Sequence, residues 1–197
     1  MHISCLAATM EAAVLPCRSS SLRWQSRQAC RRFALHRISI LIRKAWHPSQ
    51  PADNLLSQAP EDAPHILLGA EVLICDGMER LGGLDELCLE GTNELLLEMP
   101  FYRWTDQVWD TLYCLNDLRE IQIVIAHADR YPPENIRQLI SEGIPLQLNV
   151  ECLCKPLHRK RYLEWIKNGC VYYLGSDIHE YGTGYRDFEK CRKLLSR

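Results

Sequence analysis

Two of the residues best suited to chemistry in this 197-residue chain are two positions apart. Asp177 and His179 form an Asp-x-His pair on the turn that leaves the apolar run 171–174. Side chains two positions apart in an extended backbone face the same side. A carboxylate and an imidazole together suit a divalent metal such as manganese, zinc or iron. By itself, the pair is interpreted equally well as a turn carboxylate followed by a solvated histidine.

Other candidates lie in or directly after apolar runs. Glu98 is the strongest, because an acid inside an apolar strand is costly unless it is paired or bound to a metal. Glu71, in a Gly-Ala-Glu-Val stretch, is a weaker example of the same kind. His127 ends a buried run and on its own is more simply a hydrogen-bonded core residue. Arg130 beside Asp129 is more simply half of a surface ion pair, although its planar fork would suit a phosphate near a metal.

Alternating patterns predict the elements that position these residues. The α/β alternation implies parallel strands, in a barrel or in a doubly wound sheet. We expect strands at 65–75, 93–100, 121–126, 145–150 and 171–174, and helices at 105–118, 133–143, 158–168 and 187–195.

The candidate residues share one position relative to these strands. Each lies at or just past the C-terminal end of an expected strand, which is the rim where catalytic loops converge in α/β barrels. The residues with this placement are Glu98, His127, Asn149, Asp177 and His179.

Composition divides the chain. Residues 1–50 contain eight Arg or Lys and a single acid, Glu11, and all ten glycines lie at Gly69 or later. Because the whole chain has 23 basic and 25 acidic residues, 15 basic and 24 acidic residues remain in 51–197. That acidic balance argues against a nucleic-acid partner. We therefore treat 1–50 and 51–197 as two differently composed segments.

Hydropathy and cysteine content predict the compartment. No apolar run approaches the roughly 20 residues that span a bilayer, and the start lacks the apolar core of a signal peptide. The ten cysteines are scattered in a chain too long to need disulfide stapling, so we expect reduced thiols. The sequence therefore predicts a cytoplasmic protein without a membrane span.

Five short motifs in order resemble the polymerase-and-histidinol-phosphatase (PHP) superfamily. They are Gly-Ala-Glu-Val, Leu-Leu-Glu-Met-Pro, Ala-His-Ala-Asp-Arg-Tyr, Leu-Gln-Leu-Asn and Gly-Ser-Asp-Ile-His, and they cover roughly residues 65–186. Within that superfamily the chain is most similar to the bacterial manganese-dependent protein tyrosine phosphatases of capsule and exopolysaccharide synthesis.

The resemblance implies a distorted TIM-like (β/α) barrel, here incomplete at the N-terminus. It implies up to three metal ions, Mn²⁺ with Fe or Zn as alternatives, that activate a water for attack on phosphotyrosine. It implies Arg130 as the phosphate-binding residue and Arg186 as a second arginine, although Arg186 lies farther along than is usual. The implied partner is a tyrosine-phosphorylated protein, such as a bacterial tyrosine kinase of polysaccharide export. The implied metal ligands are Glu71, Glu98, His127, Asp177 and His179.

The family's early motifs are missing from residues 1–64. A His-x-His strand, a Leu-Pro-Gly-x-Asp-Asp-Gly turn and a Thr-Pro-His motif would be expected there. When the third base of each codon is joined to the first two of the next, residues 1–11 permit His-Ala-His-Phe-Leu-Pro-Gly-x-Asp-Asp-Gly. Residues 28–48 permit a stretch containing Thr-Pro-His. We therefore predict that residues 1–50 are an out-of-frame, poorly ordered segment, followed by a PHP-type phosphatase domain at 51–197.

Three functions follow from these observations. The first is a metal-dependent tyrosine phosphatase, with weak or no activity in the chain as written because ligands are missing. The second is another PHP-type phosphoesterase, such as a histidinol-phosphatase-like enzyme. The third is a catalytically inactive fragment that binds a partner or nothing.

Overall fold

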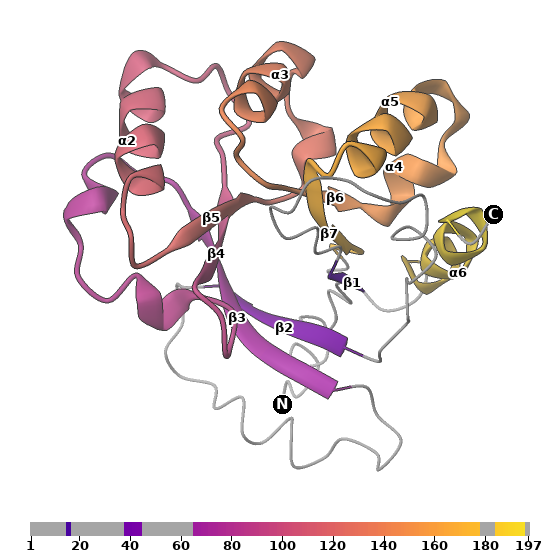
Figure 1. Ribbon diagram of the computed structural model, residues 1–197, viewed down its shortest axis with the longest axis horizontal. Helices are drawn as coiled ribbons and strands as arrows, with labels where there is room; N and C mark the ends of the chain where they lie inside the picture. Colours follow the sequence, from indigo (N-terminus) through magenta and orange to yellow (C-terminus); the bar gives the residue numbers. More distant parts are fainter. Residues whose placement is uncertain (1–14, 17–37, 45–64, 178–183, 196–197) are drawn as a thin grey trace, which may run out of the picture.

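A computed structural model describes residues 15–16, 38–44, 65–177 and 184–195, and centres on one seven-stranded sheet (Figure 1). The strand order is β1-β7-β6-β5-β4-β3-β2, with β2 to β7 mutually parallel and β1 antiparallel to β7. The strands are β1 (Leu15–Pro16), β2 (Ile38–Lys44), β3 (His65–Leu73), β4 (Glu94–Glu98), β5 (Gln122–Ile125), β6 (Leu146–Asn149) and β7 (Val171–Gly175).

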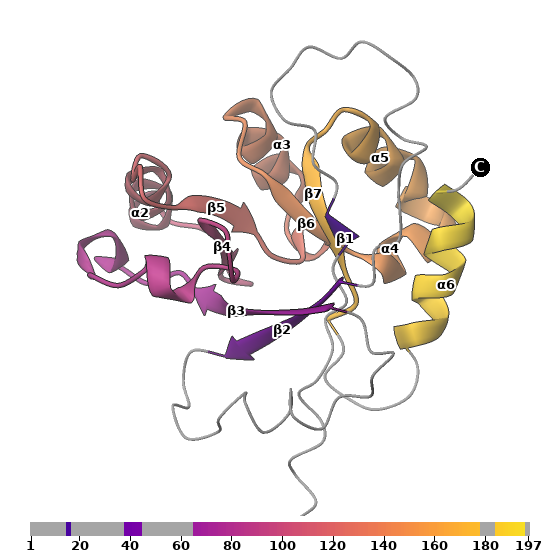
Figure 2. The same ribbon diagram turned by 60° about the horizontal axis from the view of Figure 1, so that its bottom comes forward.

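The helices follow one another around the outside of this sheet (Figures 1 and 2). The Thr105 side chain accepts a hydrogen bond from the Val108 N–H and so begins α2 at the predicted cap. Pro133 occupies the first turn of α3, where its missing N–H costs nothing. The helices are α2 (Asp106–Asn116), α3 (Pro133–Ser141), α4 (Val150–Cys154), α5 (Pro156–Lys167) and α6 (Gly184–Leu195), with short 3₁₀ turns η2 (Met78–Arg80), η3 (Asp85–Leu87) and η4 (Ala128–Arg130).

The two faces of the sheet bury different side chains. On β4, Leu95 and Leu97 belong to the large core beneath the helices, whereas Leu96 belongs to a smaller cluster on the inner face. Val124 of β5 and Tyr173 of β7 lie in the same inner cluster. Because alternate residues of a strand face opposite sides, Glu71 and Glu98 share the inner face with these side chains.

The inner face is strongly bent. The Tyr173 hydroxyl of β7 donates a hydrogen bond to the Glu94 carboxylate of β4, although β5 and β6 lie between these strands. The order β7-β6-β5-β4-β3 follows the sequence without the reversal of a doubly wound sheet. The structure thus confirms the predicted α/β fold and favours the barrel alternative over the doubly wound sheet.

The predicted elements are all present, with shifted ends. The strand expected to reach residue 75 ends at Leu73, α5 begins at Pro156 rather than 158, and α6 begins at Gly184 rather than 187. The strands β1 and β2, the short helix α4 and the 3₁₀ turns were not predicted. Within residues 1–50 the structure describes β1 and β2, which pair with β7 and β3; the rest lies outside the described residues, so the disorder expected there stays a prediction. None of the helices in the described part of the chain combines the length and apolar character that a bilayer crossing requires.

Candidate metal centre

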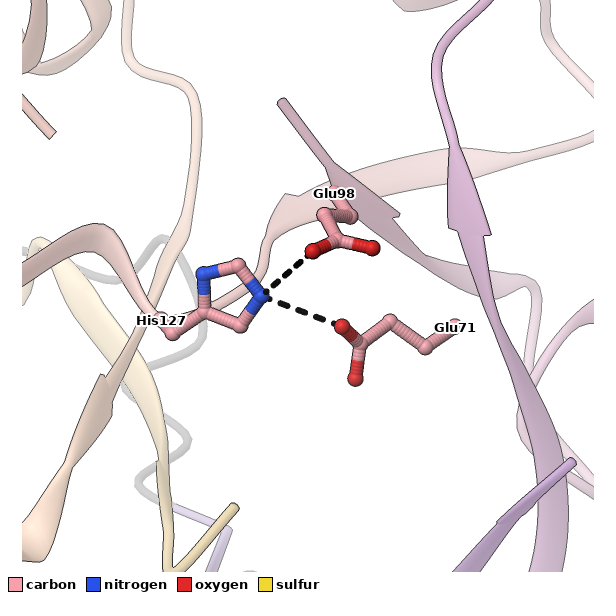
Figure 3. A group of neighbouring side chains, drawn as sticks. All are labelled: Glu71, Glu98 and His127. Carbon is pink, nitrogen blue, oxygen red and sulfur yellow. Dashed lines mark hydrogen bonds and ion pairs between the residues drawn. The ribbon is translucent and has the colours of Figure 1, made fainter. Parts of the chain in front are cut away.

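Three neighbouring strand ends deliver the candidate ligands (Figure 3). Glu71 lies on β3, Glu98 ends β4, and His127 follows β5 by two residues. The parallel register pairs Glu71 with Leu96 and Leu73 with Glu98, so both carboxylates project from one face of the sheet. The C-terminal rim thus gathers side chains that are far apart in the sequence.

The three side chains converge on one point. His127 Nε2 lies 3.0 Å from Glu71 Oε1 and 3.5 Å from Glu98 Oε1. One ligand atom from each residue lies within 4.8 Å of the other two. The His127 side chain is 2% exposed, and those of Glu71 and Glu98 are 13% and 20% exposed. The cluster is therefore largely shielded from water, yet open on the carboxylate side.

The donor set fits a divalent cation. An imidazole nitrogen and two carboxylate oxygens suit manganese, iron or zinc. Without a cation, a neutral imidazole must carry its proton on Nε2 to donate to either carboxylate, and a cation at this point would replace that proton. Glu71, Glu98 and His127 thus form the group of three ligands that could hold a metal among the described residues.

His127 is held by its backbone as well as by its ring. Its φ of 32° lies in the left-handed region, which non-glycine residues rarely adopt. The buried Gln147 side chain on β6 accepts a hydrogen bond from the His127 N–H through Oε1. Its Nε2 donates to Asn149 Oδ1 at 3.2 Å. Gln147 therefore couples the end of β5, and with it the imidazole, to β6.

A second support connects the turn after His127 to the end of β6. Asp129 Oδ1 accepts a hydrogen bond from the Asn149 N–H at 2.8 Å. Burial raises the pKa of Asp129 above its ordinary value, and the Asn149 N–H opposes that shift. Asp129 therefore acts in the fold as an acceptor for β6, in place of the surface ion pair expected with Arg130.

The imidazole of His127 packs against an aromatic ring. The ring centroids of Tyr131 and His127 lie 5.5 Å apart. The Tyr131 hydroxyl accepts a hydrogen bond from the Met99 N–H at 2.9 Å. Burial, with the Glu98 and Glu71 carboxylates adding to it, raises the pKa of Tyr131 far above its ordinary value. Tyr131 is therefore a neutral phenol at any physiological pH and serves to fix the turn after Glu98.

The structure describes some of the remaining predicted site residues and not others. Arg130 forms an ion pair with Asp177, which has a left-handed φ of 47°. Asp177 does not belong to the three-residue cluster found among the described residues. His179 lies outside the described residues. Arg186 lies on α6, but its side chain is also outside them. The structure thus brings Glu71, Glu98 and His127 together and links Arg130 to Asp177.

Sequence reasoning missed the supporting residues. Gln147 was visible only as the polar residue of a Leu-Gln-Leu-Asn strand, where alternation could equally place it toward solvent. Tyr131 was seen only as part of a motif, and Phe101 was not singled out, because apolar residues exposed to solvent are ordinary on protein surfaces.

Comparisons with known proteins identify the fold. No model of a protein family matches the chain, and no curated protein matches it. A solved structure does, with a TM-score of 0.61 and 21% identity over 80% of this chain and 73% of that one. It comes from a study of YwqE from Bacillus subtilis and CpsB from Streptococcus pneumoniae, described there as unique metal-dependent tyrosine phosphatases. The chain therefore shares the α/β fold of the matched structure, in agreement with the α/β fold expected from its sequence.

Proposed function

We propose that this chain carries the site of a metal-dependent protein tyrosine phosphatase. The observation that carries the proposal is the convergence of Glu71, Glu98 and His127 at the strand ends of a fold shared with such phosphatases. Catalytic groups of α/β barrels occupy that rim. The reaction would be hydrolysis of a phosphotyrosine ester to tyrosine and phosphate.

The proposed cofactor is Mn²⁺, with Fe or Zn as alternatives and up to three ions in all. Glu71, Glu98 and His127 would hold one ion, and Asp177 and His179 would contribute to the remainder. Such a metal lowers the pKa of a bound water and neutralises charge on a transferring phosphoryl group. Because the imidazole is fixed by Gln147 and packed against Tyr131, its nitrogen needs little reorganisation to bind a cation.

Arg130 is proposed to bind the phosphate. Its side chain is 41% exposed and pairs with an Asp177 carboxylate that is only 9% exposed. A guanidinium has five donors, so Arg130 can keep a contact to Asp177 and still present donors to a phosphate oxygen. Arg186 is proposed as a second arginine. No cysteine nucleophile is required, because the attacking group is water.

The chain as written is proposed to have weak or no activity. If residues 1–50 are out of frame, the His-x-His, Asp-Asp and Thr-Pro-His ligands are lost and at least one metal lacks most of its ligands. The gene's nucleotide sequence tests the frame directly: a shifted frame that encodes no family-like peptide upstream of codon 50 refutes this part of the proposal.

The proposed substrate is a tyrosine-phosphorylated protein, such as a tyrosine kinase of polysaccharide export, encountered in the cytoplasm. The fold similarity supports this choice because the matched structure comes from tyrosine phosphatases. A phosphopeptide panel, in which histidinol phosphate is included, would separate this substrate from that of a histidinol-phosphatase-like enzyme.

The decisive experiment compares the chain with a frame-restored version. Manganese binding is measured by calorimetry, and hydrolysis of a phosphotyrosine peptide is measured with and without manganese. We expect weak metal binding and little turnover in the chain as written, and manganese-dependent turnover in the restored version. Glu98→Gln should abolish that turnover, whereas Glu120→Gln, at an exposed loop position, should not. Equal activity in the two versions would refute the proposed impairment, and inactivity of both would refute the phosphatase assignment.

A further inference from the structure

Two large aromatic side chains follow the candidate ligand Glu98. Phe101 is 63% exposed and Tyr102 is 70% exposed, directly after the Glu-Met-Pro stretch that ends β4. Singly exposed aromatic residues are ordinary on protein surfaces. Phe101 differs from Tyr102 in what its ring touches.

Phe101 stacks on the imidazole of the metal cluster. The rings of Phe101 and His127 have centroids 5.7 Å apart and planes inclined by 15°. The Phe101 ring also lies 5.8 Å from the Tyr131 ring at an inclination of 33°. Phe101 therefore stacks on the ring of His127, a candidate metal ligand, while most of the Phe101 side chain faces solvent.

The turn that carries Phe101 is fixed on both sides. The Met99 N–H donates to the Tyr131 hydroxyl at 2.9 Å, and Trp104 Nε1 donates to the Pro100 carbonyl at 2.8 Å. Met99 and Trp104 are themselves buried. The backbone that carries the Phe101 ring is thus held in place before any ligand arrives, which favours preorganised binding.

We infer that Phe101 determines substrate specificity, by providing the surface on which the aromatic ring of an aryl phosphate lies while its phosphate occupies the metal cluster. This inference rests on the proposed phosphatase function. Because the Phe101 ring lies 5.7 Å from the His127 ring, an aryl ester of a phosphate bound at His127 would lie beside Phe101 and gain an aromatic contact that a small alkyl group cannot. Aryl esters would therefore be favoured over alkyl esters.

A simpler role for Phe101 would be to shield His127 from water. The two roles give different results. Loss of a shield would weaken metal and every phosphate ligand alike, whereas loss of a ring platform weakens only aryl ligands. The test must therefore compare an aryl and an alkyl ligand at the same metal concentration.

The experiment titrates phenylphosphonate and methylphosphonate, which are not hydrolysed, into the full chain with MnCl₂ in a calorimeter. The variants are Phe101→Ala and Phe101→Leu, with Tyr102→Ala as the matched exposed control. We expect the unaltered chain to prefer phenylphosphonate by about tenfold. Phe101→Ala should remove that preference while affinities for Mn²⁺ and methylphosphonate stay unchanged, Phe101→Leu should retain little of it, and Tyr102→Ala should keep it.

The outcomes separate the inference from the proposed function. If both phosphonates bind and Phe101→Ala keeps the preference, or if it weakens manganese and both phosphonates equally, the inference is wrong and the phosphatase proposal stands. If neither phosphonate binds in the presence of manganese, the inference is wrong, and if the frame-restored version also hydrolyses no phosphomonoester, the phosphatase proposal fails with it. Circular dichroism of each variant checks that folding is intact.

Discussion

At the scale of single residues, the geometry of the site depends on Gln147. This buried amide accepts from the His127 N–H and donates to Asn149 Oδ1, so it satisfies polar groups on two strand ends. His127 in turn keeps a left-handed backbone that an unsupported residue would leave. Gln147 is therefore a positioning residue for the imidazole.

We expect Gln147→Leu to weaken both folding and metal binding. The substitution leaves the His127 N–H and the Asn149 side-chain oxygen without this partner, which costs about 1–3 kcal/mol in the free energy of unfolding. Urea denaturation measures that loss, and calorimetry with Mn²⁺ measures the affinity. Gln138→Leu, which removes an exposed glutamine bonded to Tyr113, is the control. Unchanged manganese affinity in a folded Gln147→Leu protein would contradict the positioning role.

The sequence could indicate Glu98 but not Gln147, for a physical reason. A carboxylate inside an apolar strand needs compensation wherever the strand lies, so the anomaly is visible locally. A glutamine in an alternating strand is unremarkable until the register of β6 against its neighbours is known. Its partner His127 is 20 residues away, and only the folded sheet brings the two together.

At the scale of elements, β6 and β7 are packed too closely for a side chain at Gly175. A Cβ built there would lie 2.5 Å from Gln147 Nε2 and 3.3 Å from Gln147 Cδ. That amide cannot move freely because it holds His127 and Asn149. The glycine of the Gly-Ser-Asp-Ile-His motif is thus explained by the support of the imidazole on β5.

We expect Gly175→Ala to destabilise the protein by about 1–3 kcal/mol, the usual cost of overpacking. The displaced Gln147 amide should also lower manganese affinity. Gly82→Ala is the matched control, because no atom lies within 4 Å of a Cβ there and its φ is not in the left-handed region. Thermal unfolding of both variants checks the difference. Equal stabilities would show that the Gln147 side chain moves aside for a Cβ at position 175 at little cost.

The elements themselves were largely predictable. The buried strand β5 is apolar apart from Gln122, and α2 has both a capping threonine and helical spacing. Helix α4 was missed because it has five residues and no side-chain cap at Asn149. Strand ends also moved by one or two residues, since tertiary pairing rather than composition determines where a strand stops.

At the scale of the whole molecule, buried thiols make stability depend on alkaline pH. Burial raises the pKa of Cys88 from 9.0 to about 11 and that of Cys191 to about 12. In the unfolded chain these thiols lose their protons near pH 9, whereas in the folded protein they keep them. The unfolded state therefore binds fewer protons above pH 9, and stability must fall as the pH rises from there.

The measurement is the urea midpoint between pH 7 and pH 11. We expect it to decline above pH 9, and the decline should be smaller in the double variant Cys88→Ala and Cys191→Ala. Buried Tyr131 contributes in the same direction, so part of the slope remains. Cys75→Ala, which alters an exposed thiol, should leave the slope unchanged. If the urea midpoint of the double variant declines as steeply as that of the unaltered protein, burial of these two thiols does not cause the decline.

The alternation of strands and helices predicted an α/β molecule but could not choose between a barrel and a doubly wound sheet. That choice depends on the order of strands, which became visible only in the paired sheet. The bend likewise is seen from the contact between Glu94 and Tyr173, two residues with no individual sequence signal. The order of the five motifs along the chain was the information that tied the sequence to the fold.

The hydrogen bond between Tyr173 and Glu94 has a consequence for the order of folding. It joins residues 79 positions apart in the sequence, whereas Glu94 is paired in register with Gln122 of the adjacent strand. Closing a longer loop costs more chain entropy, and contacts of long sequence separation form slowly. We therefore expect the contact between Tyr173 and Glu94 to form late, after β4 has paired with β5 and β6 with β7.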